Sequence, residues 1–298
     1  MVQTSSEEIG QVYLPTVNMA LMLTTLSLVI GFGSSANLAG AYGVAVTTTM
    51  VITTVLAFFL MVKRWHWQVA AAGAVAGFFL LIDIPFLIAN LLKIAHGGWF
   101  PLAAGLTVFT LMTTWRHGRT VLRRRLLGEI EPLDVFIDKL STDPPHRVCG
   151  TAVFMTGRPT GTPPMLHHHL IHNQVLHEQV IILTVLTEEV PRVPATDRVS
   201  ITKMRMGFIR VIVHYGFMQS PNVPVALREC EPLGLIVELG KTTYYLARET
   251  IISTPLQSGM MRWQEKLFAF MSRNSLAATT FYNIPAEQVI ELGQQLEI

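Results

Sequence analysis

One carboxylate, Asp83, lies inside a long apolar stretch of the sequence. From Ile9 to Trp115 the only other formal charges are three basic side chains. A carboxylate within a membrane is costly and commonly functional, as a proton relay or as the partner of a cation. A structural role competes with this: Asp83 lies just before Pro85 and could cap a helix that restarts after a kink, or pair with a basic residue on a helix outside this chain. The proline frees backbone groups that need partners, which favours the capping role.

Hydroxyl groups are concentrated in the apolar segment 38–62. It contains Tyr42 and five threonines, among them Thr47 and Thr48. Threonine hydroxyls can bond to the carbonyl one turn earlier, so we expect most of them to be satisfied within their own helix. The Tyr42 phenol cannot do this as easily. Hydroxyl and carbonyl oxygens suit a partly dehydrated monovalent cation, so Tyr42, Thr47 and Thr48 are the candidate lining of a cation pathway.

A short loop in the polar half could bind phosphate. Gly157, Arg158, Thr160 and Gly161 follow a predicted strand and precede a predicted helix, where backbone amides can hold an anion. The loop matches neither GxGxxG nor a Walker sequence, so a plain turn is the competing interpretation, and the weak motif favours it.

Five neighbouring histidines invite a metal interpretation, because imidazoles three or four residues apart share a helix face. Apart from Glu178, cysteine or acidic partners with zinc-like spacing do not accompany them, so we predict no metal site and an ordinary helix with exposed histidines. The five are His167, His168, His169, His172 and His177.

Other classes of chemistry find little support. A nucleophile with a base at recognisable spacing is not identifiable, so we predict no catalytic residues, no cofactor and no enzyme activity. The 22 basic against 20 acidic residues argue against a nucleic-acid partner. Cys149 and Cys230 are widely separated and are predicted to be reduced thiols of a cytosolic domain.

These residues must be positioned by four membrane helices and a polar domain. A bilayer core of about 30 Å needs roughly 20 apolar residues, and four segments qualify, at about 14–32, 38–62, 67–92 and 99–115. They form a predicted transmembrane domain, 1–115. Basic residues collect on the cytoplasmic side. The loop at Lys63 and Arg64 and the arginines from Arg116 onward therefore lie inside, which puts both ends of the chain in the cytoplasm.

Residues 116–298 are predicted to form a cytoplasmic α/β domain. The helix that leaves the membrane carries arginines expected to meet anionic lipid. Strand-like and helical patterns then alternate, which favours an α/β sandwich. The expected strands are 150–155, 180–186, 199–206, 209–213 and 243–246, and the expected helices are 224–230, 260–271 and 286–296.

Several ordered blocks resemble one family. GQVYLPTVN at 10–18, SSANLAGAYGVAVTTTM at 34–50, DIPFLIANLLKIAHGGWFPL at 83–102, GTAVFMTG at 150–157 and VLHEQVIILTV at 175–185 are similar to the Kup/HAK/KT potassium uptake permeases. The likeness extends from about Thr4 to Ile298. Gly33 stands where that family commonly has an arginine, which leaves the outer loop unusually neutral.

The resemblance implies a plasma-membrane permease that takes up K⁺, in bacteria coupled to H⁺, on an amino-acid/polyamine/cation (LeuT-like) fold of twelve helices. Such folds build their ion sites at broken helices between two inverted repeats. Only the last four helices are represented here, so the resemblance implies missing N-terminal helices as partners and a truncated, split or fragmentary chain that is not expected to transport alone.

Two residues take roles from the resemblance. Tyr42 matches a tenth-helix tyrosine expected to line the potassium pathway, and Asp83 matches an eleventh-helix acidic residue without an assigned role. Cytoplasmic domains of related importers can bind cyclic dinucleotides, so the alternative function is a membrane-anchored regulatory module whose cytoplasmic domain binds a nucleotide. A cyclic dinucleotide and a second copy, in a homodimer, are therefore further candidate partners.

Overall fold

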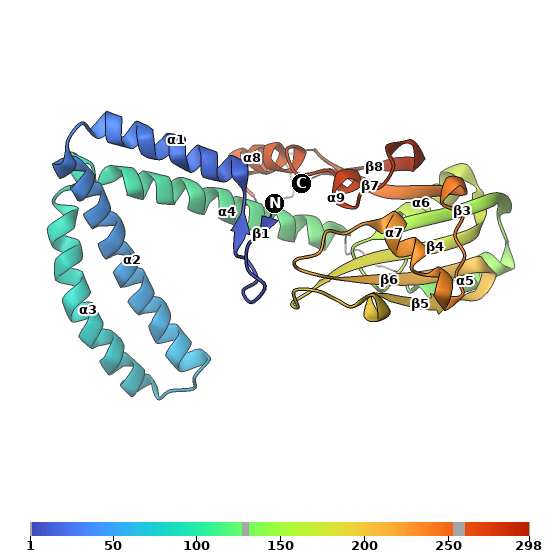
Figure 1. The fold of residues 1–298 in the computed structure, drawn as a ribbon, viewed down its shortest axis with the longest axis horizontal. Coiled ribbons are helices and arrows are strands. Elements are labelled where there is room, and N and C mark those ends of the chain that lie inside the picture. The colour runs from blue at the N-terminus through green and yellow to red at the C-terminus, as the bar shows by residue number, and fades with distance from the viewer. Residues whose placement is uncertain (1, 127–130, 253–259, 298) are drawn as a thin grey trace. The chain divides into compact units, whose positions relative to one another are not determined.

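The computed structural model describes residues 2–126, 131–252 and 260–297 (Figure 1). The chain divides into two compact units. A helical unit comprises Leu14–Thr113, and a second unit, which contains the large sheet, comprises Met1–Tyr13 together with Thr114–Ile298.

The helical unit contains α1 (Pro15–Phe32), α2 (Ser35–Lys63), α3 (Val69–Leu91) and the first half of α4 (Trp99–Leu126), with a 3₁₀ turn at Ile94–His96. Local residues explain the helix ends. Gly33 takes a left-handed φ of 60° and its N–H bonds to the carbonyl of Val29, which closes α1. The Ser34 hydroxyl then accepts from the backbone N–H of Asn37 and caps α2.

Three of the described helices, α1, α2 and α3, are each long and apolar enough to cross a bilayer. The fourth predicted span also forms a helix, but α4 runs without a break from Trp99 to Leu126 and is not one of these three helices. Its apolar part passes into an arginine-rich part without a helix end. The fourth crossing therefore stays a prediction.

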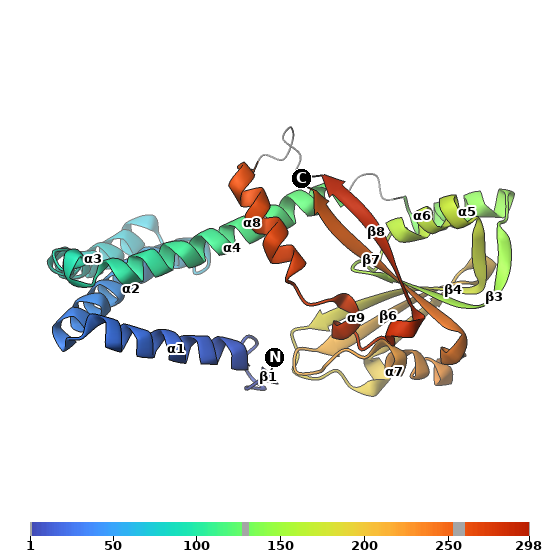
Figure 2. The ribbon, with the colours of Figure 1, turned by 90° about the horizontal axis from the view of Figure 1, so that it is seen from above.

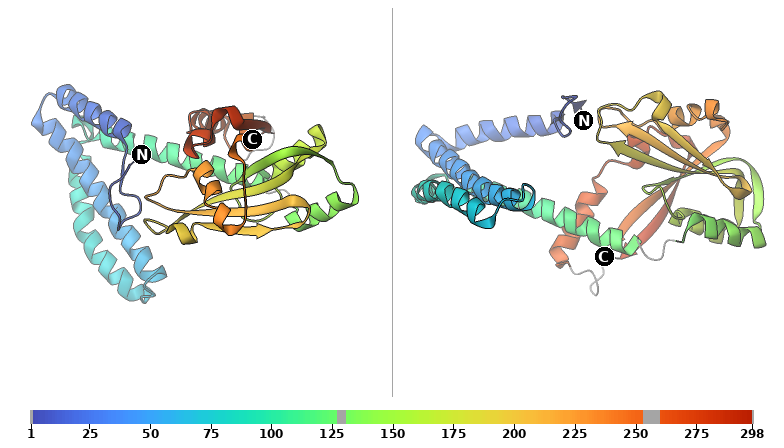
Figure 3. Two further views of the ribbon diagram at one scale, coloured as in Figure 1. Left: turned by 45° about the vertical axis from the view of Figure 1, so that its right-hand side comes forward. Right: turned by 90° about the horizontal axis from the view of Figure 1, so that it is seen from below.

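Helices α2 and α3 form an antiparallel hairpin (Figure 3) whose contact surface is made of small residues. Gly40, Ala41, Ala72 and Ala76 are among its buried positions. A side chain at Gly43 would place its Cβ 2.5 Å from Oδ1 of Asn90 on α3. Small residues let helix backbones approach closely in membranes, and at Gly43 the space is already taken by the Asn90 amide.

The sheet unit is built on six strands in the order β5-β6-β4-β3-β7-β8. All neighbouring pairs are parallel except β5 with β6. A two-stranded ribbon, β1 (Val2–Gln3) with β2 (Val12–Tyr13), belongs to the same unit. The bounds are β3 His146–Thr156, β4 Val175–Glu188, β5 Val199–Lys203, β6 Phe208–Gly216, β7 Thr242–Ile252 and β8 Val289–Glu297.

Helices cover both faces of this sheet. Figure 2 shows α5 (Leu133–Thr142) and α6 (Pro164–Asn173) on one side and α7 (Val223–Arg228) on the other. One core contains Phe136 and Leu166 beneath α5 and α6, and the other contains Val223 and Leu227 beneath α7. Because β3 is buried on both faces, its sequence contains a continuous run of apolar residues and does not alternate between apolar and polar residues. The described unit is completed by α8 (Arg262–Arg273) and α9 (Ala278–Phe281).

Most predicted elements of this domain form, with one clear error. The helix predicted at 286–296 is wrong: after a 3₁₀ turn at Ala286–Gln288 the chain forms β8, which pairs in parallel with β7 from Tyr244↔Val289 onward. Pairing with a distant strand overrides the local helical preference. The strand predicted at 199–206 ends at Lys203, because Met206 takes a positive φ of 58°.

Buried His169 makes the sheet unit sensitive to acid. Its ring lies 4.7 Å from the ring of Tyr245 and its Nδ1 lies 2.8 Å from the Asn173 amide. Burial lowers the pKa of His169, the charge of His177 lowers it further, and a backbone hydrogen bond at Val175 acts in the opposite direction. The unfolded chain therefore binds this proton more tightly, so the free energy of unfolding falls as the pH drops below about 6.5.

We predict that the sheet unit loses stability as the pH falls from neutral through the range in which His169 of the unfolded chain is protonated. The His169→Phe variant should lose distinctly less, because its side chain cannot be protonated. Urea unfolding of the full chain in detergent, followed by labelling of the buried Cys230 thiol in a Cys149→Ser background, measures this. Comparing variants at one pH cancels the thiol's own pH dependence. His167→Phe, an exposed site on the same helix, is the control, and equal pH slopes for all three proteins would refute the assignment.

Candidate functional site

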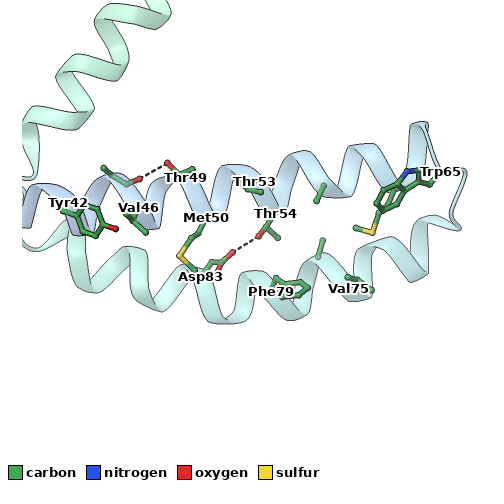
Figure 4. A pocket seen from close by; sticks show the side chains of 14 residues that line it. Tyr42, Val46, Thr49, Met50, Thr53, Thr54, Trp65, Val75, Phe79 and Asp83 are labelled. Carbon is green, nitrogen blue, oxygen red and sulfur yellow. Dashed lines mark hydrogen bonds between the residues drawn. The ribbon is translucent and has the colours of Figure 1, made fainter. Parts of the chain in front are cut away.

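A groove of about 680 Å³ lies between α2 and α3. Its walls are mostly apolar, and Figure 4 shows the polar side chains that enter it. Tyr42, Thr49, Thr53 and Thr54 come from α2 and Asp83 comes from α3. Few polar groups among many apolar ones are typical of a selective binding site.

The Asp83 carboxylate bonds across the two helices. Its Oδ2 accepts a 2.7 Å hydrogen bond from the hydroxyl of Thr54, and Asp83 is only 4% exposed. Helix α3 continues through Pro85 to Leu91, so there is no restarting helix for Asp83 to cap. The predicted capping role is wrong, because the carboxylate is directed sideways to α2 and serves as an interhelical hydrogen-bond acceptor.

The threonines divide into two groups. The hydroxyls of Thr47 and Thr49 donate to the carbonyls of Gly43 (2.8 Å) and Ala45 (2.9 Å), one turn earlier, as expected. Thr54 instead reaches Asp83. An intrahelical bond leaves a hydroxyl oxygen with a free lone pair for a cation.

The structure brings Tyr42 together with Thr49 and Thr53, seven and eleven residues further along α2, and not with Thr47 and Thr48. Thr47 is buried and Thr48 half-buried, and neither lines the groove. The helical spacing i, i+7, i+11 places three side chains on one face and could have identified this set. Tyr42 is 72% exposed on that face.

A second cavity, of about 430 Å³, lies in the sheet unit at the predicted phosphate loop. Gly157, Arg158 and Thr160 line it, whereas Gly161 does not and provides the turn with a φ of 88°. Sequence reasoning missed two further residues: Arg119 and Arg123, from the arginine-rich part of α4, also line this cavity. They lie more than thirty positions before the loop, so spacing offered no signal for their approach.

The loop is held by hydrogen bonds that leave its charged side chain free to face the cavity. The Thr184 hydroxyl donates to the carbonyl of Arg158 at 2.8 Å, and the N–H of Arg158 donates to the Thr156 hydroxyl at 3.3 Å. At the far end, the backbone N–H and the hydroxyl of Thr162 both donate to the carbonyl of Glu131. A fixed backbone of this kind is suited to positioning an anion-binding guanidinium.

The cavity also lies at the point where the order of the strands reverses. From β3 the chain proceeds to β4 and β6 on one side, and later to β7 and β8 on the other. The loop follows the carboxyl end of β3, and Ala247 of the adjacent β7 lines the same cavity. In open α/β sheets, ligands bind outside the carboxyl ends of strands at this switch point.

The five histidines do not gather into one site. His169 is buried against the rings of Tyr245 and Phe154, while His167 and His168 are exposed. In the described part of the chain, groups of three or more His, Cys, Asp or Glu side chains placed to hold a metal are absent. The histidine helix itself, α6, forms as predicted, but the prediction that its histidines are exposed is wrong for His169, and His177 lies outside the helix, in β4.

Two family models match this chain, and several known proteins are similar to it. A model described as the K⁺ potassium transporter integral membrane domain matches residues 1–120, and one described as the K⁺ potassium transporter C-terminal domain matches residues 149–298. Over its whole length the chain is 61% identical to probable potassium transport system protein Kup 1 of Geobacter sulfurreducens, 57% to a Kup protein of Nitrosomonas eutropha and 48% to one of Myxococcus xanthus.

The chain spans about half the length of these curated relatives, namely 47%, 46% and 46% of them. The C-terminal family model alone matches half of this chain, and the membrane model accounts for most of the remainder. The apolar helices α1–α3 and the six-stranded sheet agree with these two matches. The chain therefore belongs to the Kup/HAK/KT family of potassium transporters.

Proposed function

We propose that this chain forms part of a permease that takes up K⁺ across the bacterial plasma membrane by K⁺/H⁺ symport. It would contribute four membrane helices, of which α4 is the last, to a LeuT-like fold, and residues 116–298 as a cytoplasmic domain. The observation that carries the proposal is the polar set in the α2–α3 groove: four hydroxyl-bearing side chains and a buried carboxylate among apolar walls.

The groove suits one wall of a potassium pathway. A K⁺ ion that sheds water needs several oxygen ligands, and α2 offers the oxygens of Tyr42, Thr49 and Thr53 from one side only. The opposite wall must come from other helices. We infer that helices outside this chain cover the exposed face of Tyr42 and complete the site between repeats.

Asp83 is the group we assign to proton coupling. It lies within α3 far from either end, and its hydrogen bond to Thr54 keeps it beside the groove. A carboxylate in this position can be neutralised by a proton or by a nearby cation, so the two species can compete for it.

The proposed orientation follows the basic residues. Lys63 and Arg64 close α2, and the arginines of α4 follow its apolar part. With both groups on the cytoplasmic side, the two ends of this chain are cytoplasmic as well.

A second, regulatory function is favoured by the cavity of the sheet unit. Arg119, Arg123 and Arg158 surround it, and arginine is the side chain best suited to bidentate phosphate binding. The proposed ligand is a phosphate-bearing nucleotide such as a cyclic dinucleotide, whose twofold symmetry would suit a homodimer of the domain.

Removing an oxygen ligand should weaken K⁺ uptake. We predict that Tyr42→Phe and Thr49→Val each raise the KM for K⁺ about three- to tenfold, because one ligand hydrogen bond or its equivalent is worth about 1 kcal/mol. The chain is fused to the unmatched part of the Geobacter sulfurreducens relative and assayed in cells that lack potassium uptake. Thr48→Val, which alters a threonine outside the groove, is the matched control. Wild-type KM values in both groove variants, at equal expression, would remove these residues from the pathway.

The coupling role of Asp83 predicts a pH effect. In the same fusion, Asp83→Asn should make uptake nearly independent of external pH, since the amide cannot exchange a proton. Thr54→Val removes the hydrogen-bond donor but leaves the carboxylate, so it should lower expression or stability and retain the pH dependence. If Asp83→Asn keeps the full pH dependence, coupling resides elsewhere.

Charge removal in the cavity should weaken anion binding. We predict that Arg158→Gln and Arg123→Gln each reduce affinity for a cyclic dinucleotide about tenfold, as expected for a lost charge-assisted contact. Titration calorimetry of the full chain in detergent measures this, with inorganic phosphate as a second ligand. Arg248→Gln, which alters an exposed arginine paired with Glu291, should bind like the unaltered protein. Absence of heat with either ligand would exclude the regulatory function.

A further inference from the structure

Helix α8 is clamped to the arginine-rich part of α4 by one aromatic side chain. Phe268 is fully buried, and its ring centroid lies 5.5 Å from that of Trp115. A Cβ at Gly118 would approach the Phe268 ring to 2.4 Å, so the ring rests on bare α4 backbone. Leu122 is buried in the same cluster. Figure 2 shows α8 crossing the arginine-rich part of α4.

The opposite face of α8 is apolar and uncovered. Trp263 and Phe270, seven residues apart and so on one helix face, are 49% and 63% exposed, and the preceding Met261 is 65% exposed. Large aromatic side chains grouped in this way mark an interaction surface.

Basic side chains border this apolar face. Arg262, Lys266 and Arg273 are all exposed, and on a helical projection they lie on one flank of the Trp263–Phe270 line. The acidic residue of α8, Glu265, is buried and belongs to the packed side. The free surface of α8 is thus apolar and cationic, a combination typical of helices that lie in a lipid interface.

The contact of Phe268 with α4 also fixes the depth of α8 relative to the lipid headgroups. Trp115 ends the predicted fourth span, where an indole suits the headgroup layer. Gly118 lies three residues further along α4, about 5 Å at 1.5 Å per residue. Phe268 therefore holds α8 within the depth of the headgroup region, provided that α4 crosses the membrane.

We propose that α8 is an interfacial helix that binds anionic phospholipid, with Trp263 and Phe270 inserted among the acyl chains and Arg262, Lys266 and Arg273 at the phosphates. The proposal rests on the fourth span of the proposed function. Charge complementarity and the attachment to α4 select lipid as the occupant.

Site-directed fluorescence tests this in the full chain reconstituted into nanodiscs. In a Cys149→Ser background, an environment-sensitive dye is placed at Phe270→Cys, at Leu106→Cys within α4, or at Ile236→Cys, an exposed apolar site of the sheet unit. Spin-labelled lipids should quench the dyes at 270 and 106 and leave the dye at 236 bright. With phosphatidylglycerol present, quenching at 270 should be about twofold stronger than in phosphatidylcholine alone, and Lys266→Glu with Arg273→Glu should remove that difference.

The outcomes distinguish failure of lipid binding by α8 from failure of its premise, that α4 crosses the membrane. Quenching at 106 without quenching at 270 leaves the fourth span intact and overturns the lipid-binding role of α8. Quenching at neither site overturns both. A dye at 270 that is shielded from spin-labelled lipid and from aqueous iodide alike is covered by protein, for example a second copy, and this also overturns the proposal. Equal quenching in both lipid mixtures overturns the assignment of anionic headgroups.

Discussion

A membrane interior offers no water to a polar group, so each buried oxygen there must find its partner within the protein. The hydrogen bond between Asp83 and Thr54 meets this requirement for a buried carboxylate of α3. It links α2 to α3, with Gly43 seated against Asn90 toward the other end of the hairpin. These contacts align the two helices and present Tyr42, Thr49 and Thr53 along one side of the groove. The proposed ion pathway depends on that alignment.

The sheet unit follows a different rule, because it can bury apolar surface against water. Parallel strands covered on both faces place their connecting loops at one edge, and the reversal of strand order beside β3 opens a cavity there. The arginines of α4 reach this cavity while Phe268 clamps α8 to the same stretch of helix. One helix thus contributes to the proposed anion cavity and to the proposed lipid surface, which would give a bound nucleotide a physical route to the membrane-proximal part of the protein.

Long apolar segments could be predicted well from the sequence, because length and hydropathy are local properties. The strands and helices of the sheet unit were also largely predictable, but β8 was not, since its partner β7 begins more than forty residues earlier. The partner of Asp83 was equally hidden, as Thr54 lies 29 positions away and only the register of the hairpin brings them together. The group formed by Tyr42, Thr49 and Thr53 could have been predicted from the sequence, because a spacing of seven and eleven residues from Tyr42 marks one helix face. Arg119 and Arg123 were missed because the arginines of this helix were expected to meet lipid, and they lie more than thirty positions before the loop whose cavity they line.

The central claim is that this chain supplies one side of a potassium pathway whose other side comes from further helices. The most direct test is potassium uptake by cells deficient in it, expressing this chain alone, the unmatched part of the Geobacter sulfurreducens relative alone, or both together. Our account predicts uptake and growth in low-potassium medium only when both parts are present. Uptake by this chain alone would contradict it, because the α2–α3 groove would then have to conduct K⁺ without an opposite wall.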